Sequence, residues 1–417
     1  MTQMQPPQAT SATRENAPPV PAASPDSAGT PSGGPPMGRL VGVDLARALA
    51  VFGMYIVHIG PVLSSTHGVG SWVRYLADGH SSVLFATLAG FSLMLIAGRR
   101  EPKTGPAGRQ ATARIAIRAV VLLALGTVLA MEYGGVIILG FYGVYFLLAL
   151  PLLRLSAKAL AITAAGLALA TPQLAFVLNS RLSESVRQTV DAYDPLKKVS
   201  EVGVLDLLLT GFYPAITWMS FVVAGMALAR LDLSAASVRR RLAAFGAALT
   251  AGAYGLSLQL AGEDALRSMA EEAKSSAVFE KTSSFGSGSF TTHRPASDLL
   301  SAGPHSGTTF DIVGSVGVAI LVVVGATALM DRVPRLPSLA KPVIAVGTMS
   351  LTAYVGHFLV QSVLGVPAGE STQVSWSPVL MSILGAIVFA AVWSRLFRRG
   401  PLEALLNAAT KPAVYVR

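Results

Sequence analysis

The sequence predicts an all-α integral membrane protein, a bundle of about ten transmembrane helices. Of the 417 residues, 52% are hydrophobic and only 13% are charged, whereas a soluble globular chain usually carries about 25% charged residues. The apolar residues also gather into runs of about 20, the length that crosses a bilayer as a helix. Both observations favour a chain that crosses the membrane many times and has the lipid bilayer as its main partner.

Ten apolar runs justify the predicted helices, taken here in chain order. They cover residues 40–62, 81–98, 115–132, 135–153, 157–178, 204–228, 242–262, 311–330, 342–363 and 378–397. The sixth run contains Tyr213 and Pro214. Because a proline inside a helix removes a backbone hydrogen bond, we expect a kink at this point.

The distribution of basic residues predicts that both termini are cytoplasmic. With this orientation, the cytoplasmic tails and connections hold more than twice as many Lys and Arg residues as the outer connections. The positive-inside rule gives such an excess to the cytoplasmic side, so we expect a multi-pass protein of the cytoplasmic membrane. Topology and anionic lipid account for the net charge of +10, which therefore does not call for a nucleic acid partner.

The flanking segments complete the domain organisation. Residues 1–38 are rich in Pro, Ser, Ala and Gly, so we expect a disordered cytoplasmic tail. Residues 39–400 form the predicted membrane domain, with a long outer loop at about 263–310, and residues 401–417 form a cytoplasmic C-terminal tail. The chain has no cysteine, which excludes a disulfide framework, a thiolate metal site and a cysteine nucleophile. The sequence leaves the oligomeric state open, including a homo-oligomer.

A stripe of ionisable residues runs through the first predicted helix. The steps from Asp44 to Arg47 and on to His58 place all three on one face, since each residue turns a helix by about 100°. A central Asp or Arg costs roughly 2.5 to 3.5 kcal/mol in a membrane, so such a stripe indicates a functional site. Charge pairing between Asp44 and Arg47, with a structural histidine at position 58, is the alternative interpretation.

The histidines share one side of the predicted topology. All six fall on the outer side or in the outer half of a helix: His58, His67, His80, His293, His305 and His357. Histidine is the usual general acid or base near neutral pH, so we expect proton transfer near the outer face. His67 and His293 are interpreted as solvated loop residues. No pair has the i, i+4 spacing of helical metal ligands, so no metal site is predicted.

Two further sets of polar residues are candidates for binding. Ser350, Tyr354, His357 and Gln361 recur at steps of four, three and four on one face of the ninth helix. That face is either a cavity wall or an interhelical hydrogen-bond seam. Arg114 and Arg118 lie four residues apart at the cytoplasmic end of the third helix. With Arg47 they could clamp phosphates through their guanidinium groups, and snorkelling to lipid headgroups is the alternative.

Several segments resemble known membrane proteins. RLVGVDLARALAVFGMYIVHIGP is similar to the opening helix of membrane acyltransferases of the acyltransferase-3 and heparan-alpha-glucosaminide N-acetyltransferase types. The remainder resembles a bacterial membrane family of unknown function, number 418, of the YeiB type. The residues that carry this second likeness are DGHSSVLFATLAGFSL, ARIAIRAVVLLALG, GFYPAITWMSFVVAGMALARLDL, GTMSLTAYVGHFLVQS and FRRGPLEALL.

This resemblance implies transfer of an acyl group, in the first place acetyl, across the membrane. Cytoplasmic acyl-CoA would be the donor, and an outer carbohydrate or other cell-envelope molecule the acceptor. The residues themselves are compatible with this scheme: Arg47, Arg114 and Arg118 would bind the anionic donor, and Asp44 would pair with Arg47 and fix its direction. His58 would take the acceptor's proton or carry the acyl group briefly. Acceptor positioning falls to His80, His305, Ser350, Tyr354, His357 and Gln361.

Two other function classes fit the same residues. A transporter or exporter of a small molecule or envelope precursor would use Asp44, Arg47 and His357 as proton or substrate sites. A sensor or scaffold without turnover would suit the long outer loop. Donor chemistry discriminates among them, because only the acyltransferase should bind and consume acyl-CoA.

Overall fold

The structure is a computed structural model that describes residues 38–262, 295–363 and 375–416, together with Met1 and Leu266. The chain divides into two units, Met1–Pro36 and Met37–Arg417, and the architecture below is that of the second unit. The predicted disordered tail, most of the predicted long outer loop and His293 lie outside the described residues.

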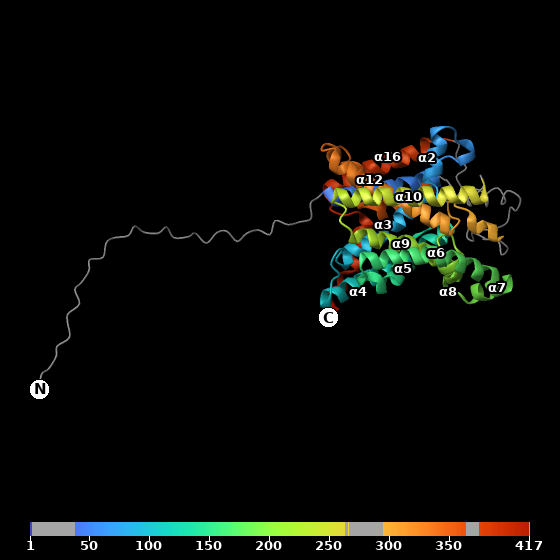
Figure 1. Cartoon of the computed structure of the whole chain (residues 1–417), viewed down its shortest axis with the longest axis horizontal. Helices are drawn as coiled ribbons and strands as arrows, with labels where there is room; N and C mark the ends of the chain where they lie inside the picture. Colours follow the sequence, from blue (N-terminus) through green and yellow to red (C-terminus); the bar gives the residue numbers. More distant parts are fainter. Residues whose placement is uncertain (2–37, 263–265, 267–294, 364–374, 417) are drawn as a thin grey trace. The chain divides into compact units, whose positions relative to one another are not determined.

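The described residues form helices and no strand, which confirms the all-α class (Figure 1). The longer helices are α1 (Gly38–Ile59), α2 (Val69–Ala77), α3 (His80–Ala97), α4 (Gly105–Tyr133), α5 (Leu139–Ala149), α6 (Ala157–Arg181), α7 (Glu184–Tyr193), α9 (Ala215–Arg230), α10 (Ala236–Ala261), α12 (Thr309–Arg332), α14 (Lys341–Thr348), α15 (Ser350–Val363), α16 (Ser377–Leu396) and α17 (Pro401–Ala409). Shorter elements are η1 (Leu63–Ser65), η2 (Gly134–Val136), η3 (Leu150–Arg154), α8 (Pro195–Val199), the π-helix η4 (Asp206–Thr210), η6 (Ala296–Leu300), α13 (Leu336–Leu339) and η7 (Lys411–Tyr415).

Among the described residues, six helices are long and apolar enough to cross a membrane: α1, α3, α4, α6, α12 and α16. A seventh span results if α14 and α15, which meet at an angle of 89°, are counted as one. The helices α5 and α9 are apolar but shorter. Every predicted run is largely helical, whereas the number of ten spans stays a prediction.

The sixth predicted run is interrupted instead of kinked. Its first part is the π-helix η4, and α9 starts only after Pro214, which occupies the N-cap position. A proline is tolerated there because no preceding turn needs its missing N–H group. The residues between the two helices, Phe212 and Tyr213 among them, are thereby released from regular helical geometry.

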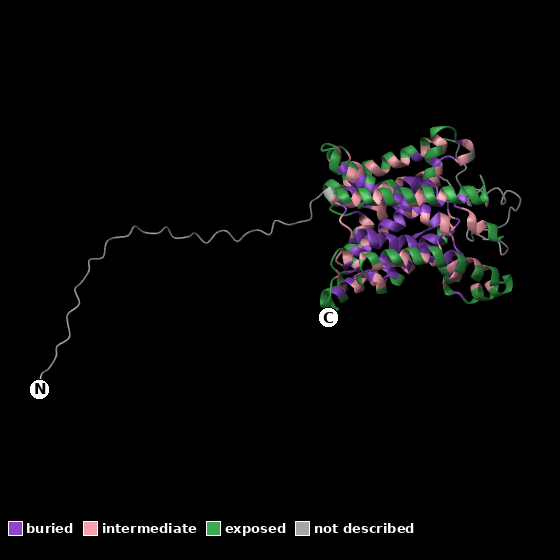
Figure 2. Cartoon of the chain, viewed as in Figure 1, coloured by how far each residue is buried: buried purple, intermediate pink, exposed green. Residues whose placement is uncertain are grey.

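The bundle has α3 and α9 at its centre and more exposed helices around them. In the apolar 18-residue stretch of α3, 78% of the residues are buried, compared with 11% in the corresponding stretch of α16. In Figure 2 the buried residues lie in the middle of the bundle and the exposed ones on its outer helices. The helix α3 packs on α9, which in turn packs on α6, while α1 packs on α3, α12 and α14.

Two glycines allow α3 and α9 to approach backbone to backbone. A Cβ atom on Gly90 would lie 1.9 Å from the carbonyl oxygen of Val222, and a Cβ atom on Gly225 would lie 1.8 Å from that of Thr87. Small residues at such positions are the usual means of close helix packing in membranes. This contact fixes the central pair of helices, around which the polar residues are arranged.

The start of α1 and the C-terminal end lie at the same end of the bundle, and α2, α7 and α8 lie at the other (Figure 1). The predicted C-terminal tail contains α17 and η7, which pack against α4. Glu403 of α17 accepts hydrogen bonds from the backbone N–H groups of Leu351 and Thr352, at 2.8 and 3.1 Å. The C-terminal segment therefore caps the first turn of α15.

Candidate functional site

A buried polar contact between distant segments joins α1 to α15. Nδ1 of His58 lies 2.8 Å from Nε2 of His357, and both side chains are buried, with 6% and 1% of their surface exposed. The two rings are stacked, with centroids 5.1 Å apart. Tyr55, one turn before His58, donates a hydrogen bond of 2.7 Å to the carbonyl oxygen of Ala353. The predicted catalytic histidine thus lies against a second histidine inside the bundle.

The neighbouring carbonyl group fixes the tautomers of this pair. Nδ1 of His357 contacts the carbonyl oxygen of Tyr354, which can only accept, so this nitrogen carries the hydrogen. In the neutral ring, Nε2 of His357 is then the acceptor, and Nδ1 of His58 must donate to it. The lone pair of a neutral His58 is consequently at Nε2. That nitrogen has the electronic state that a general base or a nucleophile requires.

The remaining residues of the predicted α15 face also make contacts within the protein. The hydroxyl of Tyr354 accepts from the backbone N–H of Ile138 at 3.2 Å. Nε2 of Gln361 donates to the carbonyl oxygen of His58 at 3.0 Å, while its Oε1 is buried and has no hydrogen-bond partner among the described residues. Ser350 is only half-buried, at the first position of the helix. The face is therefore largely an interhelical seam, as one of the two sequence interpretations had it.

Near the opposite end of α1, Asp44 and Arg47 pair as the spacing predicts. The guanidinium group of Arg47 lies 2.5 Å from the carboxylate of Asp44. It also donates to the carbonyl oxygen of Gly347 at 3.3 Å and to the hydroxyl of Ser92 at 3.2 Å. One side chain thus links α1 to α14 and α3 beside the break between α14 and α15.

Arg114 and Arg118 lie on α4, and the side chain of Arg399 lies within electrostatic reach of Arg118. Nε of Arg118 is buried and has no hydrogen-bond partner among the described residues. These three guanidinium groups form a cationic cluster at the end of the bundle where the chain terminates. The structure places Arg47 in a separate set of contacts, so the three predicted donor residues are not brought together as one clamp.

His80 belongs to a hydrogen-bonded chain at the other end of the bundle. Its Nε2 lies 2.8 Å from the hydroxyl of Tyr254, which lies 3.2 Å from that of Ser315. Ser315 donates to Asp311 at 3.0 Å, and the second oxygen of Asp311 accepts from the backbone N–H of Gly307 at 3.0 Å. This chain connects α3, α10 and α12 to the turn that carries His305. Only the step from Asp311 to Ser315 lies within one helix. Sequence spacing could not reveal the rest, because His80, Tyr254 and Gly307 lie on other helices or in a turn.

A cavity of about 90 Å³ lies beside His305. It is lined by Pro172, Ala175, Phe176, Asn179, Ser180, Leu209, Phe212, Pro214, Thr217, Trp218, Asp298, Leu299, His305, Ser306, Gly307 and Thr308. The ring of His305 packs against Phe212 and Trp218, with centroids 4.5 and 6.0 Å away. Its Nδ1 is buried without a hydrogen-bond partner among the described residues. Burial lowers the pKa of His305 from 6.5 to about 4, so the ring is neutral at physiological pH.

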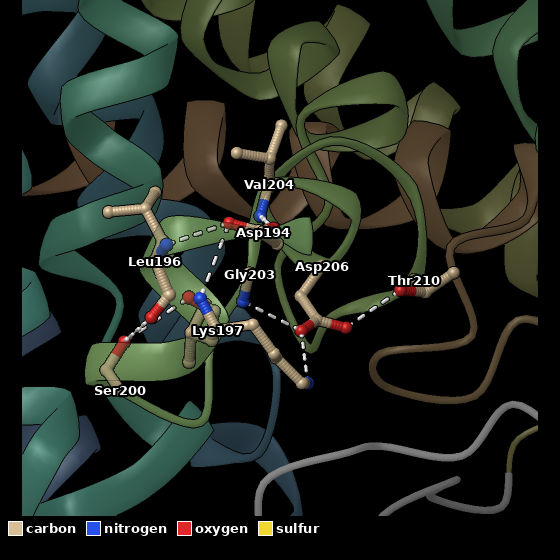
Figure 3. Close-up of polar contacts among 9 residues, drawn as sticks. Asp194, Leu196, Lys197, Ser200, Gly203, Val204, Asp206 and Thr210 are labelled. Atoms are coloured by element: carbon tan, nitrogen blue, oxygen red, sulfur yellow. Dashed lines mark hydrogen bonds and ion pairs between the residues drawn. The ribbon is translucent and has the colours of Figure 1, made fainter. Parts of the chain in front are cut away.

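A polar cluster holds the π-helix η4, which precedes Phe212 and Tyr213 in the chain (Figure 3). The carboxylate of Asp206, at the start of η4, accepts from Lys197 at 2.8 Å, from the N–H of Gly203 at 2.9 Å and from the hydroxyl of Thr210 at 2.8 Å. Asp194 caps α8 in the same cluster. These contacts hold η4 in place, and the aromatic residues that follow it are thereby directed toward His305.

The structure therefore gathers the predicted residues into separate groups. His58, Tyr354, His357 and Gln361 meet in the seam between α1 and α15, whereas His80 and His305 belong to the neighbourhood of the cavity. Neither this cavity nor a second one, described below, is lined by α1 or α15. In the part of the chain that the structure describes, no three His, Cys, Asp or Glu side chains could hold a metal ion together.

The fold and its buried polar seam define a multi-pass membrane protein with a helical bundle. Residues 39–266 match the family model of the heparan-alpha-glucosaminide N-acetyltransferase catalytic domain. This match covers more than half of the chain, which belongs to that membrane acetyltransferase-like family. Residues 292–412 match the protein of unknown function family DUF418. Both matches confirm the resemblance that the sequence motifs indicated. A search of curated proteins finds no match.

Proposed function

We propose that the protein is a membrane acyltransferase that moves an acetyl group from acetyl-CoA to a hydroxyl or amine of an outer carbohydrate or other cell-envelope acceptor. The observation that carries this proposal is the buried His58–His357 contact, in which the lone pair of His58 is at Nε2. The family match supports the reaction type. The excess of basic residues at the α1 start and C-terminal end supports a cytoplasmic donor side.

In the proposed step, Nε2 of His58 removes the proton of the acceptor as its oxygen or nitrogen attacks the thioester carbonyl carbon. The tetrahedral intermediate then expels the CoA thiolate, which receives the proton, so an ester or amide and free CoA result. His357 holds the His58 ring through Nδ1 and stabilises the positive charge that develops on it. The alternative that the sequence leaves open, an acetyl group carried on His58, uses the same lone pair.

On the donor side, the cluster of Arg114, Arg118 and Arg399 supports binding of the phosphates of CoA. Guanidinium groups bind phosphates through two parallel hydrogen bonds, and Nε of Arg118 has no protein partner among the described residues. Asp44 and Arg47 join α1 to α14 and are proposed to position the end of α1 nearest the donor. On the acceptor side, the cavity of His305 is not lined by α1, so it is proposed to hold a part of the acceptor other than the group that His58 deprotonates. Its aromatic rings and polar groups suit a hydroxylated molecule.

The test is turnover of acetyl-CoA by the protein in nanodiscs, compared among wild type, His58→Ala and Tyr55→Phe. Tyr55→Phe is the matched control because it removes a hydrogen bond from the same α1–α15 seam but no titratable nitrogen. We expect His58→Ala to abolish CoA release while Tyr55→Phe retains it. Labelled acetyl groups that stay on wild-type protein would show the covalent route. Wild-type protein that neither binds nor consumes acetyl-CoA would refute the proposal.

A transporter is the second candidate, and one observation favours it. The helices α14 and α15 meet at 89°, and broken helices frame the substrate sites of many transporters. The break lies beside Arg47, which reaches the carbonyl oxygen of Gly347. Counterflow of a labelled solute into proteoliposomes without acetyl-CoA consumption would favour this class.

A further inference from the structure

A second cavity, of about 240 Å³, lies where α3 ends and α4 begins. It is lined by Ala97, Pro102, Lys103, Gly108, Ala111, Thr112, Leu150, Pro151, Leu153 and Arg154. Three segments thus meet around it: the connection from α3 to α4, the first turns of α4, and η3. We call it the α3–α4 cavity. It involves none of the residues placed above in the donor or acceptor sites.

The charged side chains that line the α3–α4 cavity are both basic. Lys103 and Arg154 line it, and its ten lining residues include no carboxylate. The ammonium group of Lys103 donates one hydrogen bond, to the carbonyl oxygen of Ile96 at 3.0 Å, which leaves two of its three N–H groups for other acceptors. Glu101 belongs to the same connection but is not among the lining residues, and Asp232 is paired with Arg100. The lining therefore favours an anion.

A third cation braces the cavity from within the bundle. Arg230 is 8% exposed, and its guanidinium group donates to the carbonyl oxygens of Arg99 and Leu153. These two carbonyl groups belong to the segments on either side of the cavity. Arg230 therefore holds the two walls in position, and its charge adds to the positive potential of Lys103 and Arg154.

The backbone around the cavity makes one close approach and contains two residues with positive φ. A Cβ atom on Gly108 would lie 2.4 Å from the carbonyl oxygen of Lys103, so only glycine permits this approach of the connection to α4. The connection also bends through Gly98, with a φ of 113°, and Arg99, with a φ of 54°. Non-glycine residues rarely adopt a positive φ, and such conformations concentrate at binding sites.

We propose that the α3–α4 cavity binds a phosphate group. Its two lining cations provide N–H donors for phosphate oxygens, and its volume is far larger than a single water molecule needs. Two sources share this chemistry: a soluble phosphate compound, and the headgroup of an anionic lipid. The proposal does not depend on acyl transfer, because it concerns a site separate from the His58–His357 pair and from the Arg118 cluster.

The test uses pyrophosphate as the probe, titrated calorimetrically into the full-length protein in nanodiscs of phosphatidylcholine alone. We expect saturable binding that weakens at least about tenfold in the double variant Lys103→Gln/Arg154→Gln, since each charge-assisted contact is worth that much. Arg241→Gln, which removes an exposed arginine at the start of α10, is the control and should bind as wild type. Lys103→Arg keeps the charge and should retain binding even if the double variant is poorly folded.

A parallel measurement in nanodiscs that contain phosphatidylglycerol identifies the source of the phosphate. If native mass spectrometry finds phosphatidylglycerol retained by wild type but not by the double variant, and pyrophosphate no longer binds, the occupant is a lipid headgroup. If pyrophosphate still binds, the occupant is a soluble phosphate. Wild-type protein that holds neither probe, or a well-folded double variant that binds both as wild type does, would overturn the proposal. Neither readout measures acetyl-CoA turnover. A failure of the phosphate-site proposal can therefore be told apart from a failure of the proposed acyltransferase function.

Discussion

His58 and His357 share a hydrogen bond of 2.8 Å although each lies in the segment of a different family match. His58 is in the segment that matches the acetyltransferase catalytic domain, and His357 is in the segment that matches DUF418. The candidate site is therefore assembled from both parts of the chain. A protein that carried only the first segment would lack the partner that determines the tautomer of His58.

The first prediction concerns this partner. His357→Phe removes the acceptor for Nδ1–H of His58, so we expect kcat to fall by about 10²- to 10⁴-fold, as general-base catalysis is worth about this much, with little change in KM. His357→Gln keeps an acceptor oxygen and should restore part of the rate. Steady-state kinetics of acetyl-CoA turnover measure both variants. Equal kcat in wild type and a folded His357→Phe protein would rule out the positioning role.

The second prediction concerns the cationic cluster. Arg118→Gln should raise the KM for acetyl-CoA about tenfold, because one charge-assisted phosphate contact is lost. The effect should shrink as salt is added, since salt screens the attraction between the cationic cluster and the phosphates of CoA. Arg335→Gln, an exposed arginine elsewhere, is the control and should leave KM unchanged. A KM for Arg118→Gln that matches wild type at low salt would remove this cluster from the donor site.

The third prediction concerns the packing of α3 on α9. Gly90→Ala places a Cβ atom 1.9 Å from the carbonyl oxygen of Val222, so the two helices must separate, at a cost of about 1 to 3 kcal/mol or more. Gly356→Ala in α15 meets no atom within 4 Å and is the matched control, neutral or stabilising by up to about 1 kcal/mol. Thermal unfolding in detergent compares the two. Equal midpoints would contradict the close contact.

Periodicity predicted the faces of the helices but not what they meet. The ion pair of Asp44 and Arg47 follows from their spacing of three on one helix. The contact of His58 with His357 does not, because a polar face on each of two helices leaves their register and their neighbours undetermined. Gln361 and Tyr354 share the predicted face with His357, but their partners come from α1 and from the residue before α5.

Two further features, the α3–α4 cavity and the bend between α14 and α15, could not be predicted from the sequence either. The basic residues near Lys103 are explained by topology in the sequence, and only the fold brings Arg154 beside Lys103 around one cavity. The bend between α14 and α15 lies within a continuous apolar run, so hydropathy counts it as one helix. The sequence offered one hint, Gly347, since a glycine in an apolar run often marks a close helix contact. In the structure α14 approaches the backbone of Asp44 at this residue.

The last prediction uses the pKa of His305, which burial lowers from 6.5 to about 4. Between these values the unfolded chain binds a proton at this position and the folded protein does not. The contribution of the neutral His305 ring to the free energy of unfolding is therefore fully present above about pH 6.5, and it is lost as the pH falls toward 4. On acidification from pH 7 to pH 5, wild type should lose up to about 2 kcal/mol through this group.

His305→Asn removes the titrating group and should lose less stability over the same range. Differential scanning fluorimetry from pH 8 to pH 5, with both proteins in one detergent, measures the two midpoints, and other groups that titrate cancel in the comparison. Any advantage of wild type over His305→Asn in unfolding midpoint should narrow or reverse toward pH 5. The reason is that only wild type has an imidazole that stays neutral when folded and binds a proton when unfolded. Parallel curves would show that the ring of His305 protonates as easily in the folded protein as in the unfolded chain.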